Sequence, residues 1–107
     1  MAPLADDSGK AGRAAAIVQA LAHPARLRLV AALCAEEQDA ATLGALLSLR
    51  PAQVTRLLRP LLALGLIAPA RAGRPTRYRL AEPALHGLVA CMEDCAGPRL
   101  RPVRPRP

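Results

Sequence analysis

Residues 39–80 read DAATLGALLSLRPAQVTRLLRPLLALGLIAPARAGRPTRYRL, and this stretch decides the fold. Two helix-like apolar patterns, residues 42–47 and 51–64, are separated by a short polar turn. A strand-like run at residues 66–68 follows, then a Gly-Arg-Pro turn and a second run at residues 76–80. Two helices joined by a short turn and followed by a β-hairpin predict a helix-turn-helix with a wing.

Prolines and a glycine set the limits of these elements. Pro51 suits the first position of the second helix, and Gly65 suits its end. Pro69 has no N–H to donate, so the first strand of the hairpin should lie at a sheet edge. Pro60 falls inside the second helix, where it removes the hydrogen bond to the Arg56 carbonyl and should bend the helix.

The same stretch carries the excess charge of the whole chain. The 107 residues have a formal net charge of +7. Between Ala40 and Ala81 there are seven arginines and no acidic residue, whereas the rest of the sequence is nearly balanced. A concentrated basic field favours nucleic acid or another acidic surface as the partner. The arginines are Arg50, Arg56, Arg59, Arg71, Arg74, Arg77 and Arg79.

Helical patterns flank the central stretch. Residues 11–22 and 25–35 are rich in alanine and leucine, which are strong helix formers, and His23-Pro24 separates them. Residues 82–96 form the last helical pattern. The expected fold class is therefore mainly α with a β-hairpin wing, a winged helix-turn-helix of about five helices and two strands.

A chain of this length forms one domain at most. That domain should span residues 11–97. Residues 1–10 are polar and should be a disordered N-terminal tail. Residues 98–107 consist mostly of arginine and proline and should be a second disordered tail. The arginines of this tail either add non-specific affinity for DNA or have no role.

The sequence favours a cytoplasmic location. Its first residues lack the apolar run of a signal peptide, and no stretch approaches the roughly 18 to 20 apolar residues of a membrane span. In that compartment three cysteines indicate thiols, metal ligands or redox groups rather than a disulfide framework. An enzyme is not expected, because neither histidine has a visible partner and no glycine-rich phosphate loop is present.

The segment LAHPARLRLV at residues 21–30 resembles the LA-(D/H)-P-x-R-L-x-I-L opening of the ArsR/SmtB (arsenic-repressor) family of winged-helix repressors. The resemblance covers roughly residues 11–96. Its individual motifs are weak, and their combination in this order is specific. The further matching segments are Leu43-Gly44-Ala45-Leu46-Leu47, Val54-Thr55-Arg56-Leu57-Leu58, Leu64-Gly65-Leu66-Ile67, Gly73-Arg74 and Tyr78-Arg79-Leu80.

The resemblance implies a homodimer paired through its first and last helices. It also implies a recognition helix in the major groove of a double-stranded operator, and release from DNA when an effector binds. Two features depart from the family pattern, and one of them is Pro60 inside the recognition helix, which puts the exact docking angle in doubt. Many metalloid sensors of the family have Cys-x-Cys at the start of the third helix, where this chain has Asp39-Ala40-Ala41.

The candidate DNA contacts lie on the recognition helix and the wing. Gln53, Thr55 and Arg56 occupy its first two turns, where side chains reach base edges. Arg50 and Arg59 are better placed for phosphates, which position the protein without reading sequence. The alternative is that these residues form only a solvated face. On the wing, the residues suited to phosphates or a minor groove are Arg71, Arg74, Arg77 and Arg79.

The candidate effector ligands are the three cysteines. Cys91 and Cys95 are four residues apart, so a helix places both thiols on one face, where a thiophilic ion can bridge them. Trivalent arsenic or antimony prefers three thiolates, and Cys34 is the remaining candidate. The family resemblance implies that the second helix approaches the last one. The pattern of aspartate and histidine that binds zinc on the last helix of the family is not reproduced, since His86 is the one histidine there.

Other functions remain open at this stage. Some family members sense persulfide or oxidants by linking a second-helix cysteine to a last-helix cysteine, and Cys34 with Cys91 or Cys95 fits that outline. All three cysteines also suit the role of small buried hydrophobic residues. A regulator with an effector that does not bind thiols is another possibility. So is a winged-helix module that senses nothing and binds DNA or protein.

Overall fold

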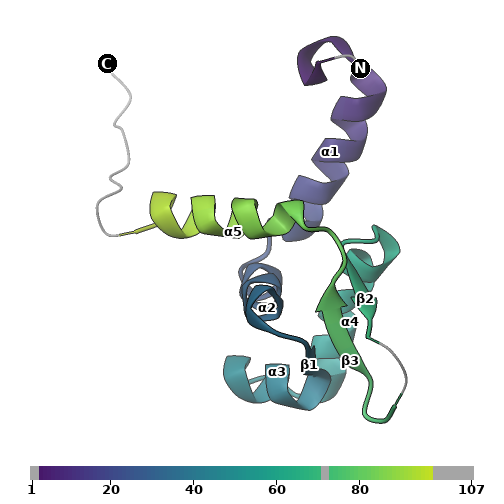
Figure 1. The fold of residues 1–107 in the computed structure, drawn as a ribbon, viewed down its shortest axis with the longest axis vertical. Helices are drawn as coiled ribbons and strands as arrows, with labels where there is room; N and C mark the ends of the chain where they lie inside the picture. Colours follow the sequence, from purple (N-terminus) through teal and green to yellow (C-terminus); the bar gives the residue numbers. More distant parts are fainter. Residues whose placement is uncertain (1–2, 71–72, 98–107) are drawn as a thin grey trace.

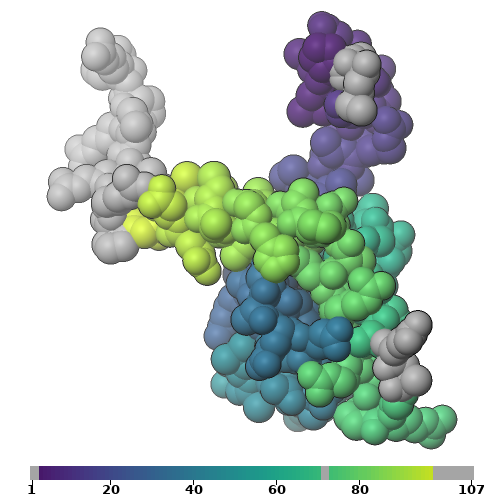
Figure 2. Space-filling view, viewed as in Figure 1, coloured from purple at the N-terminus to yellow at the C-terminus, as the bar shows by residue number. Residues whose placement is uncertain are grey.

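The computed structural model describes residues 3–70 and 73–97. Helix α5 crosses α2, a small sheet lies beside them, and α1 projects away from the body (Figure 1; space-filling view in Figure 2). This architecture confirms the predicted winged helix-turn-helix. The elements are the 3-10 turn η1 (Leu4–Asp6), α1 (Ser8–Leu21), α2 (Pro24–Ala35), β1 (Gln38–Asp39), α3 (Ala40–Leu47), α4 (Pro51–Ala63), β2 (Ile67–Pro69), β3 (Arg77–Leu80) and α5 (Ala84–Cys95).

Helix α1 begins earlier than the sequence pattern indicated. The Asp7 carboxylate accepts a hydrogen bond of 2.9 Å from the Lys10 backbone N–H and thereby caps the helix at Ser8. Part of the tail expected to be disordered at residues 1–10 is therefore helical. The other tail, residues 98–107, lies outside the described residues.

The boundary between α1 and α2 has a local cause. His23 Nδ1 accepts a hydrogen bond of 3.1 Å from the Ala25 N–H, and Pro24 occupies the first helical position. Within the part of the chain that the structure describes, no single helix is long and apolar enough to cross a membrane. Only α1 and α2 together pass that test, and they are bent by 95° at this junction.

Helices α3 and α4 are joined by a turn that depends on two residues. Ser48 ends α3 in the left-handed conformation with φ of 60°, and the Leu49 N–H donates to the Gly44 carbonyl at 2.8 Å. A Cβ atom on Gly44 would lie 2.5 Å from the Leu49 carbonyl oxygen. The turn can approach α3 this closely only because position 44 has no side chain.

Helix α4 continues through Pro60 to Ala63, with the Leu64 N–H bonded to the Pro60 carbonyl at 3.1 Å. The bend expected at this proline stays a prediction. The positive φ of 72° at Gly65 lets the chain leave the helix for β2.

The sheet has three strands in the order β1-β3-β2, one more than the sequence predicted. β2 and β3 pair antiparallel, with Ala68 opposite Arg79, and Pro69 lies on an edge strand as expected. β1 has only two residues, which is too short for an alternating pattern to reveal it. It exists because the backbone of Gln38 and Asp39 pairs with β3.

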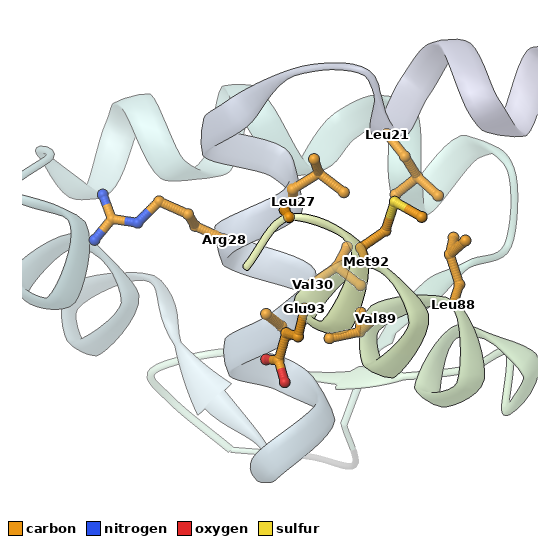
Figure 3. Close-up of a pocket in the computed structure, with 10 residues that line it drawn as sticks. Leu21, Leu27, Arg28, Val30, Leu88, Val89, Met92 and Glu93 are labelled. Carbon is orange, nitrogen blue, oxygen red and sulfur yellow. The ribbon is translucent and has the colours of Figure 1, made fainter. Parts of the chain in front are cut away.

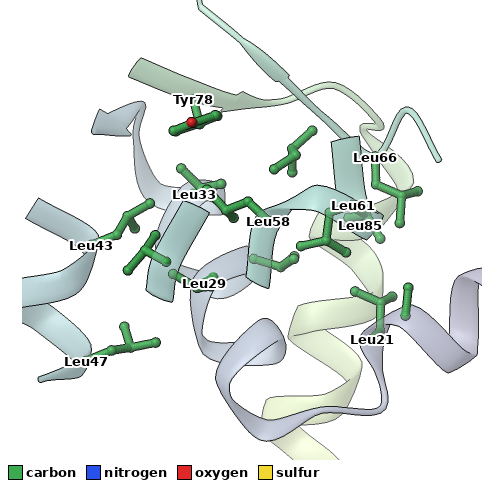
Figure 4. Close-up of a cluster of buried hydrophobic side chains, with 14 residues drawn as sticks. Leu21, Leu29, Leu33, Leu43, Leu47, Leu58, Leu61, Leu66, Tyr78 and Leu85 are labelled. Atoms are coloured by element: carbon green, nitrogen blue, oxygen red, sulfur yellow. The ribbon is translucent and has the colours of Figure 1, made fainter. Parts of the chain in front are cut away.

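Leucines from α1, α2, α3, α4 and α5 meet Ile67 and Tyr78 of the sheet in one apolar core (Figure 4). Leu29 on α2, Leu43 on α3 and Leu58 on α4 are completely buried. Tyr78, the only aromatic residue of the chain, packs against this core from β3. The core holds α4 in a defined orientation relative to α2 and the wing. A fixed orientation is what the exposed face of α4 needs in order to bind a partner.

Candidate functional site

The recognition helix has a buried face and an exposed face. Val54, Leu58 and Leu61 are buried in the core. Arg56 and Arg59 lie on the other side of α4 and are exposed. Helical periodicity therefore directs these two guanidinium groups away from the core.

Two of the predicted base-reading residues also have roles within the helix. Gln53 Oε1 accepts a hydrogen bond of 2.9 Å from the Arg50 N–H, which caps the start of α4. Thr55 Oγ1 donates to the Pro51 carbonyl at 3.1 Å. These bonds use the side-chain carbonyl oxygen of Gln53 and the hydroxyl group of Thr55. Arg56 is thus the best candidate for direct readout of a base.

The predicted wing residues do not behave alike. Arg74 and Arg79 are exposed, and Arg71 lies outside the described residues. Arg77 Nη2 donates to the Glu37 carbonyl at 2.7 Å, and Arg77 pairs with Asp39 across the sheet. Arg77 therefore attaches the wing to the segment at β1. This bond leaves fewer N–H groups of the Arg77 guanidinium for a phosphate. Sequence spacing alone does not distinguish it from the other wing arginines.

Asp39 occupies the position of the missing Cys-x-Cys motif and has a structural role. Its carboxylate accepts a hydrogen bond of 2.7 Å from the Thr42 N–H at the start of α3. This bond lowers the pKa of the Asp39 carboxyl below its usual value, and the charge of Arg77 contributes. The residue caps the helix that supports α4.

Sequence reasoning missed one link between α2 and the recognition helix. Arg26 Nε donates a hydrogen bond of 2.9 Å to the Leu57 carbonyl of α4. Arg26 is half-buried, and it belongs to the LAHPARL segment. An arginine among the apolar residues of that segment was the available signal, but its partner is 31 residues away in the sequence.

The two cysteines of the last helix lie side by side. The Sγ atoms of Cys91 and Cys95 are 4.0 Å apart, and both side chains are exposed in this protomer. The hydrogen bond between the two thiols is the main reason that the pKa of the Cys91 thiol is raised. The nearby charge of Asp94 raises this pKa further. The sequence expectation that these thiols share a face of α5 agrees with this geometry.

Cys34 does not join that pair within one protomer. It lies half-buried on α2, where burial raises the pKa of its thiol and the charge of Glu93 adds to the shift. Among the described residues, no three His, Cys, Asp or Glu side chains are grouped so that they could hold a metal ion. All three cysteines belong to this part of the chain. The three-thiolate site is therefore not assembled by one subunit.

Helices α1, α2 and α5 line an open apolar hollow of about 220 Å³. Figure 3 shows Leu21, Leu27 and Val30 facing residues of α5 across it. Next to the hollow, Val18 is 65% exposed, Leu88 37% and Met92 40%. α1 has only two buried residues, both at its C-terminal end. A protomer alone thus leaves apolar surface of α1 and α5 in contact with water.

Comparison with solved structures gives a consistent set of similar folds. The solution structure of apo-NmtR is 30% identical, covers 100% of this chain and 89% of its own, and has a TM-score of 0.74. AntR, an antimony-specific transcriptional repressor, is 26% identical over 84% of this chain and 85% of its own, with a TM-score of 0.73.

The homodimeric winged helix-turn-helix DNA-binding domain of Mb0332 from Mycobacterium bovis superimposes with a TM-score of 0.77. It covers 99% of both chains at 22% identity, which supports the fold alone. Neither the protein-family models nor the curated proteins give a match to this sequence.

Proposed function

This chain belongs to the ArsR/SmtB family of winged helix-turn-helix transcriptional regulators, and from that premise we propose that it is a sequence-specific DNA-binding repressor released by an effector. The observation that carries the proposal is the exposed basic face of α4. Arg56 and Arg59 project from a helix whose other side is buried in the core, within a stretch that has no acidic residue. Such a basic, exposed helix face suits binding in the major groove of DNA, next to the phosphate backbone.

In this proposal the residues divide by role. Arg56 reads a base in the major groove, assisted by Gln53 and Thr55. Arg50 and Arg59 contact phosphates on either side of the groove. Arg74 and Arg79 on the wing contact the adjacent backbone, together with Arg71. Arg77 contributes mainly by holding the wing in place through its bond to Glu37.

The proposed effector is a thiophilic species that binds the cysteines of α5. Cys91 and Cys95 are positioned as a pair, and AntR, a repressor specific for antimony, is among the similar structures. Soft ligands such as thiolates select soft metals and metalloids. Binding at α5 would act on DNA through α2, which packs against α5 and is bonded to α4 through Arg26.

The DNA-binding proposal is tested with an operator selected by the protein from a pool of random duplexes. Arg56→Ala should lower operator affinity by about 1–3 kcal/mol and relax the preference at one base pair, because a bidentate contact is lost. Fluorescence anisotropy on the operator and on substituted duplexes measures both effects at fixed salt.

Arg74→Ala is the matched comparison on the wing. It should weaken binding to all sequences alike and reduce the slope of log affinity against log salt by about one unit, because one phosphate contact is lost. The same operator affinity in wild type and Arg56→Ala at moderate salt would exclude Arg56 as the reading residue. Absence of any sequence preference in the wild type would favour a DNA-binding or protein-binding module instead of a repressor.

A further inference from the structure

We propose that Arg26 is a positioning residue for DNA reading, because its hydrogen bond to the recognition helix compensates for a backbone bond that Pro60 removes. The bond from α2 holds the turn of α4 that carries Arg56 at a fixed orientation. The part of this inference that concerns DNA rests on the proposed function of the chain as a DNA-binding repressor. The pairing of Arg26 with Pro60 depends only on the contact between α2 and α4.

Pro60 leaves α4 one hydrogen bond short. In a regular helix each backbone N–H donates to the carbonyl four residues earlier. Pro60 has no N–H, so the Arg56 carbonyl lacks its regular donor, and the proline ring crowds that carbonyl. The helix nevertheless continues to Ala63, and the Leu64 N–H bonds to the Pro60 carbonyl at 3.1 Å. The weak point therefore lies inside α4, at residues 56–60, and not at its end.

Arg26 supplies a donor at that weak point. Its Nε donates a hydrogen bond of 2.9 Å to the carbonyl of Leu57, the residue that follows Arg56. A carbonyl oxygen can accept two hydrogen bonds, so the bond from Arg26 adds to the one that the Leu61 N–H makes in a regular helix. A charged donor also gives a stronger bond than a neutral one. The turn thus gains a bond from α2 where proline has removed one from α4.

Helix α2 holds this donor in place. Arg26 precedes Leu29 and Val30 by three and four residues, so the three side chains share one side of the helix. Leu29 and Val30 are buried in the core, and Arg26 is half-buried next to them. Its apolar stem can cover core residues while the guanidinium group reaches the carbonyl. The donor is therefore fixed to the core and not to a mobile surface side chain.

The supported turn carries the residue proposed to read a base. Leu58 and Leu61 lie on either side of Pro60 and are completely buried, which anchors one face of α4. Arg56 is exposed on the other face, where a small tilt of the turn displaces the end of its long side chain. A bidentate contact to a base needs a defined orientation, whereas phosphate contacts carry no sequence information. Loss of the Arg26 bond should therefore impair base discrimination more than general affinity for DNA.

The first test is hydrogen exchange of the free full-length protein, followed by NMR. The protection factor of the Leu61 amide is measured relative to that of Leu47 in α3, so that a change in global stability cancels. Arg26→Met should lower this ratio by about tenfold, the effect of losing a charged hydrogen bond. In the Pro60→Ala background the same substitution should lower it by less than about threefold, because the helix has regained its own bond. Arg28→Met, which removes an exposed arginine from α2, is the matched control.

Two results of this measurement would overturn the pairing. One is an equal effect of Arg26→Met in both backgrounds, and the other is an equal effect of Arg28→Met. The single variant Pro60→Ala keeps the test decisive if Arg26→Met does not fold, because alanine favours a helix. It should raise the relative protection of Leu61, and an unchanged or lower value would show that α4 is not short of a bond. Circular dichroism verifies that each variant is folded.

The second test separates positioning from a purely structural role. Affinity is measured for the selected operator and for a duplex substituted at the base pair that Arg56 reads. Arg26→Met should lower the ratio of the two affinities by about fivefold or more, towards the ratio of Arg56→Ala. Its affinity for a non-specific duplex should match that of Arg28→Met. A purely structural role would reduce the active fraction and leave the ratio unchanged, and this result would overturn the positioning role.

Failure of the proposed function gives a different result. A wild type without any sequence preference would contradict the repressor proposal, and the exchange measurements would still report on the pairing of Arg26 with Pro60. Sequence-specific binding together with an unchanged affinity ratio in Arg26→Met would support the repressor and overturn the positioning role alone.

Discussion

Gly44 illustrates at the residue scale how a missing side chain shapes the DNA-binding unit. Its Cβ position is 2.5 Å from the Leu49 carbonyl oxygen, and a backbone atom cannot move away cheaply. Gly44→Ala should therefore destabilise the protein by about 1–3 kcal/mol, as overpacking typically does. Urea unfolding followed by circular dichroism measures the change.

Gly12→Ala is the control for that substitution. Gly12 lies inside α1, and a Cβ atom there would meet nothing within 4 Å. Alanine should stabilise this position by about 0.5–1 kcal/mol through helix propensity. If Gly44→Ala and Gly12→Ala changed the free energy of unfolding equally, the close approach of Leu49 to Gly44 would not be the reason that position 44 needs glycine.

Asp39 makes the start of α3 sensitive to acid. Its pKa in the folded state is lowered, first by the hydrogen bond from the Thr42 N–H. The stabilisation is therefore fully present above the pKa of the unfolded chain and is lost as pH falls through the folded pKa. The melting temperature of wild type should exceed that of Asp39→Ala at neutral pH, and the difference should shrink on acidification.

Asp39→Ser supplies the comparison, because serine caps a helix without titrating in this range. Its advantage over Asp39→Ala should stay nearly constant with pH. A constant difference between wild type and Asp39→Ala at all pH values would rule out the carboxylate as the acid-sensitive group.

At the scale of elements, α2 and α4 pack through apolar side chains and are also joined by a hydrogen bond from Arg26 to Leu57. Arg26→Met keeps most of the side-chain volume but removes the donor to the Leu57 carbonyl. It should cost about 1.5–3 kcal/mol of stability, the range for hydrogen bonds that involve a charged group. It should also uncouple operator binding from the effector, because α4 loses its polar link to α2.

Arg28→Met is the matched variant, since Arg28 is an exposed arginine on the same helix. Chemical denaturation and effector titrations of operator complexes distinguish the two variants. The role assigned to Arg26 would be contradicted if Arg28→Met lost as much stability, or if Arg26→Met responded to the effector like the wild type.

At the scale of the whole molecule, the protomer exposes apolar surface that a second copy would cover. Val18 on α1 and Leu88 on α5 lie beside the apolar hollow. Val18→Glu should convert a homodimer to monomers and weaken operator binding, because two half-sites are no longer engaged together. Light scattering coupled to size-exclusion chromatography measures the molecular mass.

Leu64→Glu is a suitable control for oligomeric state. Leu64, the C-cap of α4, is 41% exposed and does not line the apolar surface between α1, α2 and α5. This variant should keep the mass of a dimer. A monomeric wild type at micromolar concentration would contradict the predicted pairing through the first and last helices.

Much of the fold was predictable because its signals are local. Pro24, Pro51 and Gly65 mark helix ends through the backbone dihedrals that they allow or exclude. The pairing of Cys91 with Cys95 follows from the helical period in the same way. The early start of α1 at Ser8 also has a local cause, the Asp7 cap, which the sequence contained and the predicted boundary missed.

The sequence by itself determined the order of the helices and wing, the basic character of one segment and the spacing of the α5 thiols. Only the tertiary structure decided that β1 joins the sheet, that Arg26 bonds to Leu57, and that Cys34 stays apart from the other cysteines. Local dihedral preferences and helical periodicity act over a few residues, so they can be read along the chain. Contacts between distant segments depend on how the core orients whole elements, which no short pattern specifies.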